Sequence, residues 1–301
     1  MPRGGRNAGY ARTVASGVLM AASADPSLSI SDPFLEADRI VCHVLALSRA
    51  AIHAHPETRV SPRDLTRVAE LAARRAAGEP MAHILGSTLF RGRPFIANGS
   101  ALIPRTETEV LAAMADEFLK SLPGDAVFAD WCTGSGCIAI TLLEDNPDCF
   151  AYAADSSGDA LELAKKNAAA RGVGDRIKFF QSADPAEAAS LIPLKSLDMI
   201  VSNPPYIPTR DIDALEVQVR DYEPAEALDG GPDGLGVYRI LLPVLPRFMK
   251  RGAALFMETG GGRQIGGIES IGAEISKNLE YYGVSRDHCG IDRFMQWRKL
   301  A

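Results

Sequence analysis

The spacing of hydrophobic and polar positions changes near residue 80 of the chain. Before that point, apolar side chains recur at helical intervals in three runs, the first of which contains Val14, Val18 and Leu19. Asp32-Pro33 and Ser61-Pro62 each place a capping side chain before a proline, which is a common start of a helix. The pattern therefore predicts a small helical bundle in residues 1–80.

Glycine, proline and aromatic residues interrupt the helical spacing after Pro80. Their distribution predicts a β-hairpin in residues 81–104, which would join the bundle to a second domain. The next helix is predicted over Glu107–Leu119, with Thr106 as its cap and Glu109 completing a capping box.

Short apolar runs alternate with helical segments through residues 105–301. The runs predict the strands Ala126–Trp131, Phe150–Ala154, Ile177–Phe180, Leu197–Val201, Ala253–Glu258, Tyr282–Asp287 and Arg293–Arg298. The helices predicted between them are Cys137–Glu144, Ser157–Arg171, Pro185–Ser190, Gly236–Lys250 and Arg263–Asn278. This alternation is typical of an α/β fold with a mostly parallel, doubly wound sheet, which carries its sites at the carboxyl ends of the strands. Residues 207–235 are too long for a simple connector, and we expect a lid or substrate-binding segment there.

The segment Ser202-Asn203-Pro204-Pro205-Tyr206 follows the predicted strand Leu197–Val201. Because proline cannot donate to a sheet ladder, the strand must end there and leave Asn203 and Tyr206 at its carboxyl end. A stiff turn of this kind can hold the Asn203 amide, the Pro204 carbonyl and the Tyr206 ring around a small planar group. Such a clamp suits methylation of an amide or an exocyclic amine. The alternative interpretation is a Pro-Pro turn that closes a strand over a buried tyrosine.

A second candidate site is the loop Thr133-Gly134-Ser135-Gly136, which lies between a predicted strand and a helix. Asp155 ends the next strand, nineteen residues beyond Gly136, where an acid can accept both hydroxyls of an adenosine ribose. A dinucleotide and S-adenosylmethionine both fit this pattern, so a nicotinamide-dependent dehydrogenase remains a candidate. Asp184 follows the third strand, where it would either bind an adenine amine or cap a helix.

The composition argues against several classes of partner and cofactor. The net charge of −6 argues against general nucleic-acid binding. Five scattered cysteines without a C-x-x-C pair fit a reducing cytoplasm, and five histidines without metal-ligand spacing predict no metal. We expect a cytoplasmic monomer without a membrane span or stable nucleic-acid binding.

The first residues also contain a possible targeting signal. Arg3, Arg6 and Arg12 precede the apolar stretch Val14–Ala24, as in a secretory signal peptide. We favour the first helix of the folded bundle, because Ser16 and Gly17 weaken the apolar core that a signal peptide needs.

These motifs together resemble the HemK/PrmC family of glutamine methyltransferases, which modify the Gly-Gly-Gln motif of class I peptide chain release factors. The resemblance covers roughly Asp38 to Arg293. It rests on Ile84-Leu85-Gly86, Leu102-Ile103-Pro104-Arg105, Glu107-Thr108-Glu109, Thr133-Gly134-Ser135-Gly136, Asp198 to Ile207, Tyr222-Glu223-Pro224, Ala227-Leu228 and Asp292-Arg293. The Ile-Pro-Arg-x-Glu-Thr-Glu run is the most specific of them, since Asn-Pro-Pro-Tyr also occurs in enzymes that methylate adenine or guanine amines.

The resemblance implies a Rossmann-like class I methyltransferase domain in residues 105–301 and a substrate-recognition domain in residues 1–80. It implies S-adenosylmethionine as the methyl donor and a release-factor glutamine as the acceptor. The expected cofactor-binding residues are Cys132, Thr133, Gly134, Ser135, Gly136, Asp155, Asp184 and Asn203. The expected substrate-binding residues are Asn203, Pro204, Pro205, Tyr206, Arg105 and Glu107, of which Asn203, Pro204 and Tyr206 are expected to be catalytic.

The sequence departs from the family pattern at several positions. Cys132 stands where the first loop glycine is expected, and Trp131, His83 and Thr106 replace the usual leucine, tyrosine and proline. If position 132 requires a positive φ, the cysteine side chain introduces strain there. Two rival functions remain open: methylation of a nucleobase amine, and a binding module that keeps the fold without turnover.

Overall fold

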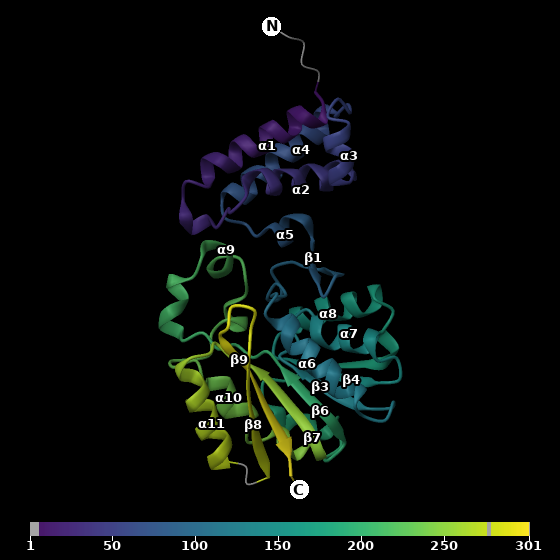
Figure 1. The fold of residues 1–301 in the computed structure, drawn as a ribbon, viewed down its shortest axis with the longest axis vertical. Coiled ribbons are helices and arrows are strands. Elements are labelled where there is room, and N and C mark those ends of the chain that lie inside the picture. Colours follow the sequence, from purple (N-terminus) through teal and green to yellow (C-terminus); the bar gives the residue numbers. More distant parts are fainter. Residues whose placement is uncertain (1–5, 276–277, 301) are drawn as a thin grey trace. The chain divides into compact units, whose positions relative to one another are not determined.

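The computed structural model describes residues 6–275 and 278–300 of the chain (Figure 1). It contains two compact units, which are treated separately below. The helical unit comprises residues up to Ser87 together with Ala214–Tyr222, and the sheet unit comprises Thr88–Asp213 and the residues from Glu223 onward. The domain boundaries expected at residues 80 and 104 stay predictions, because the compact units divide at other positions.

The helical unit is built from five consecutive helices and a short sixth from later in the chain. They are α1 (Ala8–Ala22), α2 (Pro33–Leu45), α3 (Arg49–Ala54), α4 (Pro62–Ala76), α5 (Met81–Leu85) and α9 (Val217–Arg220). Asp32 accepts hydrogen bonds from the backbone of Phe34 and Leu35, and Ser61 accepts one from Asp64, so both predicted caps are confirmed. Helix α1 contributes Ala8, Ala11, Ala15 and Leu19 to the core of this unit, as expected for its first helix.

The sheet unit contains a seven-stranded sheet with the order β5-β4-β3-β6-β7-β9-β8. Its strands are β3 (Val127–Trp131), β4 (Phe150–Asp155), β5 (Ile177–Gln181), β6 (Leu197–Ser202), β7 (Met249–Glu258), β8 (Leu279–Arg286) and β9 (Asp292–Lys299). The first five in this list are parallel, and β9 runs antiparallel to β7 and β8. The predicted mostly parallel α/β sheet is therefore confirmed. The predicted hairpin is present as β1 (Ser87–Phe90) and β2 (Arg93–Ile96).

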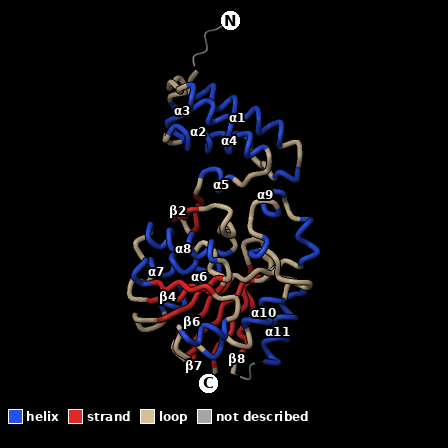
Figure 2. Tube along the Cα trace, turned by 180° about the vertical axis from the view of Figure 1, so that it is seen from behind, coloured by secondary structure: helices blue, strands red, loops and turns tan. Residues whose placement is uncertain are grey.

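Helices cover both faces of the sheet (Figure 2). One core lies under α6 (Thr108–Lys120), α7 (Cys137–Asp145) and α8 (Gly158–Ala170), and the other lies under α10 (Gly236–Leu241) and α11 (Arg263–Ile275). Neighbouring strand residues alternate between the two cores: Phe128 and Val201 enter the first, and Ala129 and Ile200 the second. Because the sheet is buried on both faces, the sequences of its strands are continuous apolar runs.

One predicted helix is wrong in part. The helix expected over Gly236–Lys250 ends at Leu241, and β7 already begins at Met249. Pro243 and Pro246 account for the difference, because proline removes a helical hydrogen bond and clashes with the preceding turn. The short helix expected over Pro185–Ser190 is present as a 3-10 helix with the same bounds. The helix expected to reach Asn278 is described as far as Ile275, and residues 276–277 lie outside the described residues.

The predicted capping box at Thr106 is also wrong. Helix α6 begins at Thr108, and Glu107 occupies the N-cap position without a side-chain capping bond. The carboxylate of Glu109 instead accepts a 2.7 Å hydrogen bond from the backbone N–H of Arg91, in the hairpin turn. Within the described ranges, none of the helices is long and apolar enough to span a membrane.

Gly136 should be intolerant of a side chain, and Gly172 provides a matched control. Both have positive φ, +80° and +71°, but a Cβ at Gly136 would lie 2.8 Å from Ile140 Cδ1 and 3.1 Å from Ala164 Cβ, whereas Gly172 faces open space. Gly172→Ala should lower the free energy of unfolding by about 1 kcal/mol through backbone strain alone. Gly136→Ala should lower it by about 2 kcal/mol or more, because overpacking adds to the strain. Urea denaturation measures both, and equal losses would contradict the close packing of α7 on α8.

Candidate functional site

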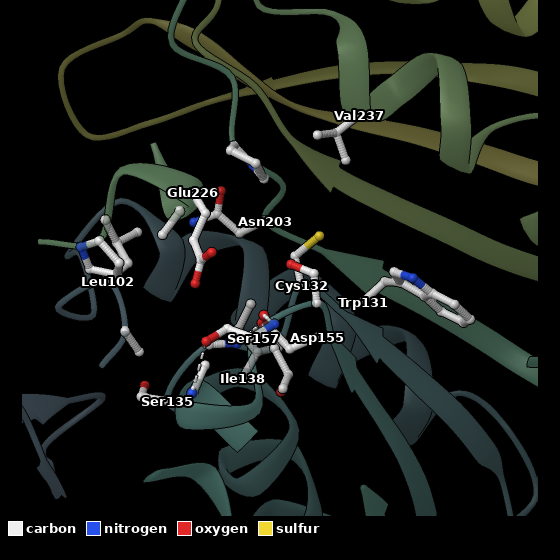
Figure 3. A pocket seen from close by; sticks show the side chains of 18 of the residues that line it. Leu102, Trp131, Cys132, Ser135, Ile138, Asp155, Ser157, Asn203, Glu226 and Val237 are labelled. Atoms are coloured by element: carbon white, nitrogen blue, oxygen red, sulfur yellow. Dashed lines mark hydrogen bonds between the residues drawn. The ribbon is translucent and has the colours of Figure 1, made fainter. Parts of the chain in front are cut away.

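The candidate site lies where β3, β4 and β6 end. The loops after these parallel strands line one cavity of about 380 Å³, within the range of small-molecule sites (Figure 3). The sequence-predicted residues that line it are Arg105, Cys132, Thr133, Gly134, Ser135, Asp155, Asn203 and Pro205. The fold thus brings the glycine loop and the Asn-Pro-Pro-Tyr segment to a common space.

The loop after β3 follows a left-handed path. Cys132 has φ +60° and Gly134 has φ +54°, so the positive φ considered for position 132 is confirmed. A non-glycine residue in this conformation costs roughly 1–2 kcal/mol. The Thr133 N–H donates to the Ala154 carbonyl over 3.0 Å, which ties the loop to β4. Burial raises the pKa of the Cys132 thiol, which therefore stays protonated and is a poor nucleophile at neutral pH.

Asp155 is held in a fixed orientation at the end of β4. Its two carboxylate oxygens accept backbone hydrogen bonds from Gly134 (2.8 Å) and Ser157 (3.0 Å). Each oxygen keeps a further lone pair, so the carboxylate can still accept hydroxyl donors from a ligand. Burial raises the pKa of Asp155, although the two backbone N–H groups oppose this effect. These contacts suit the predicted role of Asp155 as an acceptor for ribose hydroxyls.

A buried acid beneath the loop, Asp130, was missed by the sequence analysis. Its Oδ2 accepts hydrogen bonds from the Thr133 hydroxyl (2.7 Å) and the Ala139 N–H (3.2 Å), so it fixes both ends of the loop. Desolvation by burial raises its pKa to about 7. The signal was present in the sequence, because an acid within an apolar strand just before a glycine-rich loop needs a specific partner.

The Asn-Pro-Pro-Tyr segment is anchored at both ends. The Asn203 Nδ2 donates to the Thr108 hydroxyl over 3.1 Å, and the Tyr206 carbonyl accepts a 2.6 Å bond from Gln264 Nε2. Asn203 and Pro205 line the cavity, whereas Pro204 and Tyr206 are not among the residues that line it. The Tyr206 ring packs against the core under α10 and α11, and burial raises the pKa of its hydroxyl to about 12.

Two glycines of the predicted lid allow its backbone to approach this segment closely. A Cβ on Gly234 would lie 2.3 Å from the Tyr206 carbonyl oxygen, and one on Gly230 would lie 2.8 Å from its Cα. Ile207, the residue directly after the segment, exchanges backbone hydrogen bonds with Leu228 and Gly230. The part of the predicted lid from 228 to 234 therefore holds the Asn-Pro-Pro-Tyr segment in place by backbone contact.

Arg105 and Glu107 occupy different surroundings. Arg105 lines the cavity and donates to the buried Glu223 over 2.7 Å, and the other oxygen of Glu223 accepts from the Ile103 N–H. This joins the Leu102–Arg105 segment to the loop that follows Tyr222, a role for Glu223 that the sequence analysis did not predict. Glu107 is not among the cavity-lining residues and takes the first position before α6.

The charged side chains that line the cavity are mostly acidic. Among the described residues they are Arg105, Asp155, Glu226 and Asp229, and the guanidinium of Arg105 is already paired with Glu223. Figure 3 shows Glu226 extending from the lid among the lining side chains. An excess of negative charge favours a cationic ligand and disfavours the diphosphate of a dinucleotide.

Two predicted cofactor residues lie outside the cavity lining. Gly136 is needed for the packing of α7 on α8, and Asp184 is an exposed cap that accepts a 2.8 Å bond from the Ala186 N–H. The preceding residues, Ser182 and Ala183, do line the cavity. Contact between Asp184 and an adenine amine stays a prediction. The described residues contain no group of three or more His, Cys, Asp or Glu side chains that could hold a metal ion.

Comparison with known proteins gives consistent matches. The PrmC N-terminal domain family matches residues 19–86, and the methyltransferase small domain family matches residues 111–219. A release factor glutamine methyltransferase of Nitratidesulfovibrio vulgaris is 40% identical over 270 residues, 90% of each chain. One of Geobacter sulfurreducens is 38% identical over 76% of this chain and 78% of its own. The crystal structure of a release factor-specific protein-(glutamine-N5) methyltransferase from Alicyclobacillus acidocaldarius is 28% identical, with a TM-score of 0.42, over 69% of this chain and all of that one.

The raised pKa of Asp130 predicts a pH-dependent stability. Because its pKa in the folded state lies above the unfolded value of 3.8, the folded protein binds more protons between pH 4 and 7 and loses stability as the pH rises through this window. Asp130→Asn cannot ionise, so its free energy of unfolding should decline less between pH 4 and 7 than that of the parent. Urea denaturation across this range measures the difference. Parallel declines would show that Asp130 ionises as readily in the folded state as in the unfolded chain.

Proposed function

The chain belongs to the family of release factor glutamine methyltransferases, and on this premise we propose that it methylates a glutamine side-chain amide. The methyl donor is S-adenosylmethionine, and the acceptor is the glutamine of the Gly-Gly-Gln motif of class I peptide chain release factors. The observation that carries the proposal is the convergence of Asn203 and Asp155 on one cavity from β6 and β4, the two strands that flank β3. Asn203 can hydrogen-bond to an acceptor amide, and Asp155 can hydrogen-bond to the hydroxyls of a ribose.

The residues at the ends of β3 and β4 fit S-adenosylmethionine. Asp155 keeps free lone pairs for the ribose hydroxyls, and the loop residues Cys132, Thr133, Gly134 and Ser135 line the cavity beside it. The acidic lining suits a sulfonium cation better than a dinucleotide. When bound, S-adenosylmethionine supplies an electrophilic methyl group. The protein residues then have to orient the acceptor nitrogen.

Asn203 and Pro204 provide that orientation. An amide nitrogen is a weak nucleophile, because its lone pair is delocalised into the carbonyl group. The side-chain oxygen of Asn203 and the backbone carbonyl of Pro204 accept hydrogen bonds from the two N–H groups of the acceptor amide. These bonds direct the nitrogen lone pair towards the methyl donor. The ring of Tyr206 supports the plane of the amide. The methylated amide is a strong acid and loses its extra proton to water or to these oxygens, so the clamp needs no strong base.

Arg105 and Glu107 would bind the substrate beside the acceptor glutamine, because Arg105 lines the cavity and Glu107 lies two residues further along the chain. The helical unit would bind the release factor outside its Gly-Gly-Gln motif. The enzyme would act as a monomer in the cytoplasm. A nucleobase amine is the second candidate acceptor, since it also presents a planar N–H₂ group that Tyr206 could stack on. The net charge of −6 disfavours nucleic acid as a partner.

Cofactor choice is tested by calorimetric titration. S-adenosylmethionine should bind, whereas a nicotinamide dinucleotide should release no heat, because its diphosphate meets the acidic lining of the cavity. Asp155→Ala should lower the affinity for S-adenosylmethionine by at least about tenfold, because the hydrogen bonds to the ribose are lost. Glu162→Ala, an exposed acid on the outer surface of α8, is the control and should leave affinity unchanged. Tight dinucleotide binding without S-adenosylmethionine binding would refute the cofactor assignment.

The acceptor is tested with labelled S-adenosylmethionine in separate reactions. The cognate release factor should take up label, and its variant with alanine in place of the Gly-Gly-Gln glutamine should not. Bulk RNA and DNA should remain unlabelled. Label on nucleic acid alone would favour the nucleobase alternative, and cofactor binding without any label would favour a non-catalytic module.

The clamp is tested by substitutions within the acceptor segment. Asn203→Ala and Asn203→Asp should each lower kcat by at least about a hundredfold, the scale observed when a positioned polar group is lost. Tyr206→Phe should keep most of the activity, because the ring acts through packing, and Tyr206→Ala should not. Near-parental turnover by Asn203→Ala would reduce the segment to a structural turn.

A further inference from the structure

The side-chain amide of Gln264 lies between the loop after β7 and the Asn-Pro-Pro-Tyr segment. Gln264 belongs to the first turn of α11 and was not among the predicted site residues. Its Oε1 accepts a 3.0 Å hydrogen bond from the backbone N–H of Gly260 and a longer one, of 3.4 Å, from the Thr259 hydroxyl. Its Nε2 donates over 2.6 Å to the backbone carbonyl of Tyr206. One side chain thus joins two loops that follow neighbouring strands.

The two backbone groups determine the orientation of the Gln264 amide. A backbone N–H can only donate, and a backbone carbonyl can only accept. The N–H of Gly260 therefore requires the amide oxygen, and the carbonyl of Tyr206 requires the amide N–H₂ group. Exchanging the oxygen and the nitrogen would place donor against donor and acceptor against acceptor, so the side chain satisfies both loops in one orientation only.

Two glycines leave the space that this amide and Tyr206 occupy. A Cβ on Gly260 would lie 2.7 Å from Gln264 Oε1 and 3.1 Å from Cδ2 of the Tyr206 ring. A Cβ on Gly234, in the predicted lid, would overlap with Gln264 Nε2 and with the Tyr206 carbonyl oxygen. The Gln264 amide is therefore packed between two backbones and against the same tyrosine to which it donates. Its position and that of Tyr206 depend on each other.

The bond from Gln264 supplies an anchor that the segment cannot obtain from its own N–H groups. Pro204 and Pro205 have no N–H to donate, so side chains and carbonyls have to hold this turn. The side chain of Asn203 is held at the start of the segment by the Thr108 hydroxyl. At the other end, the carbonyl of Tyr206 is held by Gln264.

We propose that Gln264 is a positioning residue, which acts through the Tyr206 carbonyl to hold the tyrosine end of the proposed clamp. The inference rests on the proposed function, since it explains how the Tyr206 ring and the Pro204 carbonyl keep their places before the acceptor amide arrives. Without the bond from Gln264, the peptide group after Tyr206 is free to rotate. The ring then loses its fixed direction, and the acceptor amide loses the support of its plane.

Kinetics with the release factor provide the first test. Gln264→Met keeps an unbranched side chain of similar length but removes both hydrogen bonds, and it should lower kcat by at least about tenfold. The dissociation constant of S-adenosylmethionine should stay within about twofold, because Gln264 does not line the cavity, and this also shows that the variant folds. Gln296→Met makes the same change in the middle of β9 and should leave kcat unchanged. Parental kcat in Gln264→Met, or an equal loss of cofactor affinity, would overturn the proposal.

A pH profile tests whether donation to the Tyr206 carbonyl is what the site needs. Gln264→Glu keeps the shape of the side chain. Its protonated carboxyl can accept from Gly260 and donate to Tyr206 as the amide does, whereas its ionised form can only accept. The ratio of the variant's kcat to the parental kcat should therefore rise by at least about tenfold as the pH falls from about 8 to about 5. The nearby ionisable residues Tyr206, Glu258 and Arg293 are present in both enzymes, so the ratio largely removes their titration. A ratio that is independent of pH would contradict the proposal.

A measurement without turnover separates this inference from the proposed function. The backbone N–H of Ile207 donates to the Leu228 carbonyl over 3.0 Å and has no bond to Gln264, so its hydrogen exchange reports on the segment beyond Tyr206. Gln264→Met should accelerate this exchange by about tenfold or more, whereas the N–H of Leu255 in the centre of β7 should exchange as in the parent. Unchanged exchange at Ile207 overturns the inference even if the release factor is methylated. Accelerated exchange at Ile207 alone supports it even if the acceptor proves to be another amide or amine.

Discussion

Parallel alignment of β3, β4, β6 and β7 is the constraint on which the site depends. In a parallel sheet all strands end at the same edge, so segments separated by more than a hundred residues meet there. Thr133, Asp155, Asn203 and Glu258 each lie at or just beyond the end of one of these four strands. A shift of one residue in any strand would turn its side chains to the opposite face and separate the glycine loop from the Asn-Pro-Pro-Tyr segment. The apolar residues that set the register therefore also set the chemistry.

The same edge gathers acids that a protein core usually excludes. Asp130, Glu223 and Glu258 are buried, and burial raises the pKa of each. Hydrogen bonds from hydroxyl and backbone N–H groups offset part of the desolvation, and Glu223 also has the guanidinium of Arg105. Asp130 fixes the glycine loop, and Glu223 fixes the Leu102–Arg105 segment. The loss of stability that such burial entails is consistent with a site whose polar groups must be oriented before a ligand arrives.

The sequence predicted the sheet and its motifs well, because apolar runs and prolines act locally. Errors arose where tertiary contacts compete with a local signal. Glu109 had the spacing of a capping box, yet its carboxylate serves the hairpin turn at Arg91, a contact that local spacing cannot reveal. Asp130 was overlooked although its signal was local, since its partner Thr133 lies only three residues further along the chain. At Asp184 the sequence left a ligand contact and a helix cap open, and the structure shows the cap.

Cys132 shows how the fold can keep a strained backbone without the glycine expected there. The residue before it is fixed because the Trp131 carbonyl accepts a 2.6 Å bond from the Ser202 hydroxyl, and the residue after it is fixed because Thr133 donates to Ala154. A residue between two such anchors has no room to relax, so it adopts φ +60° whatever its side chain. The thiol is small enough to pack against the neighbouring core and recovers part of the strain energy by burial. The loop therefore keeps the path that presents Gly134 to Asp155 without a glycine at position 132.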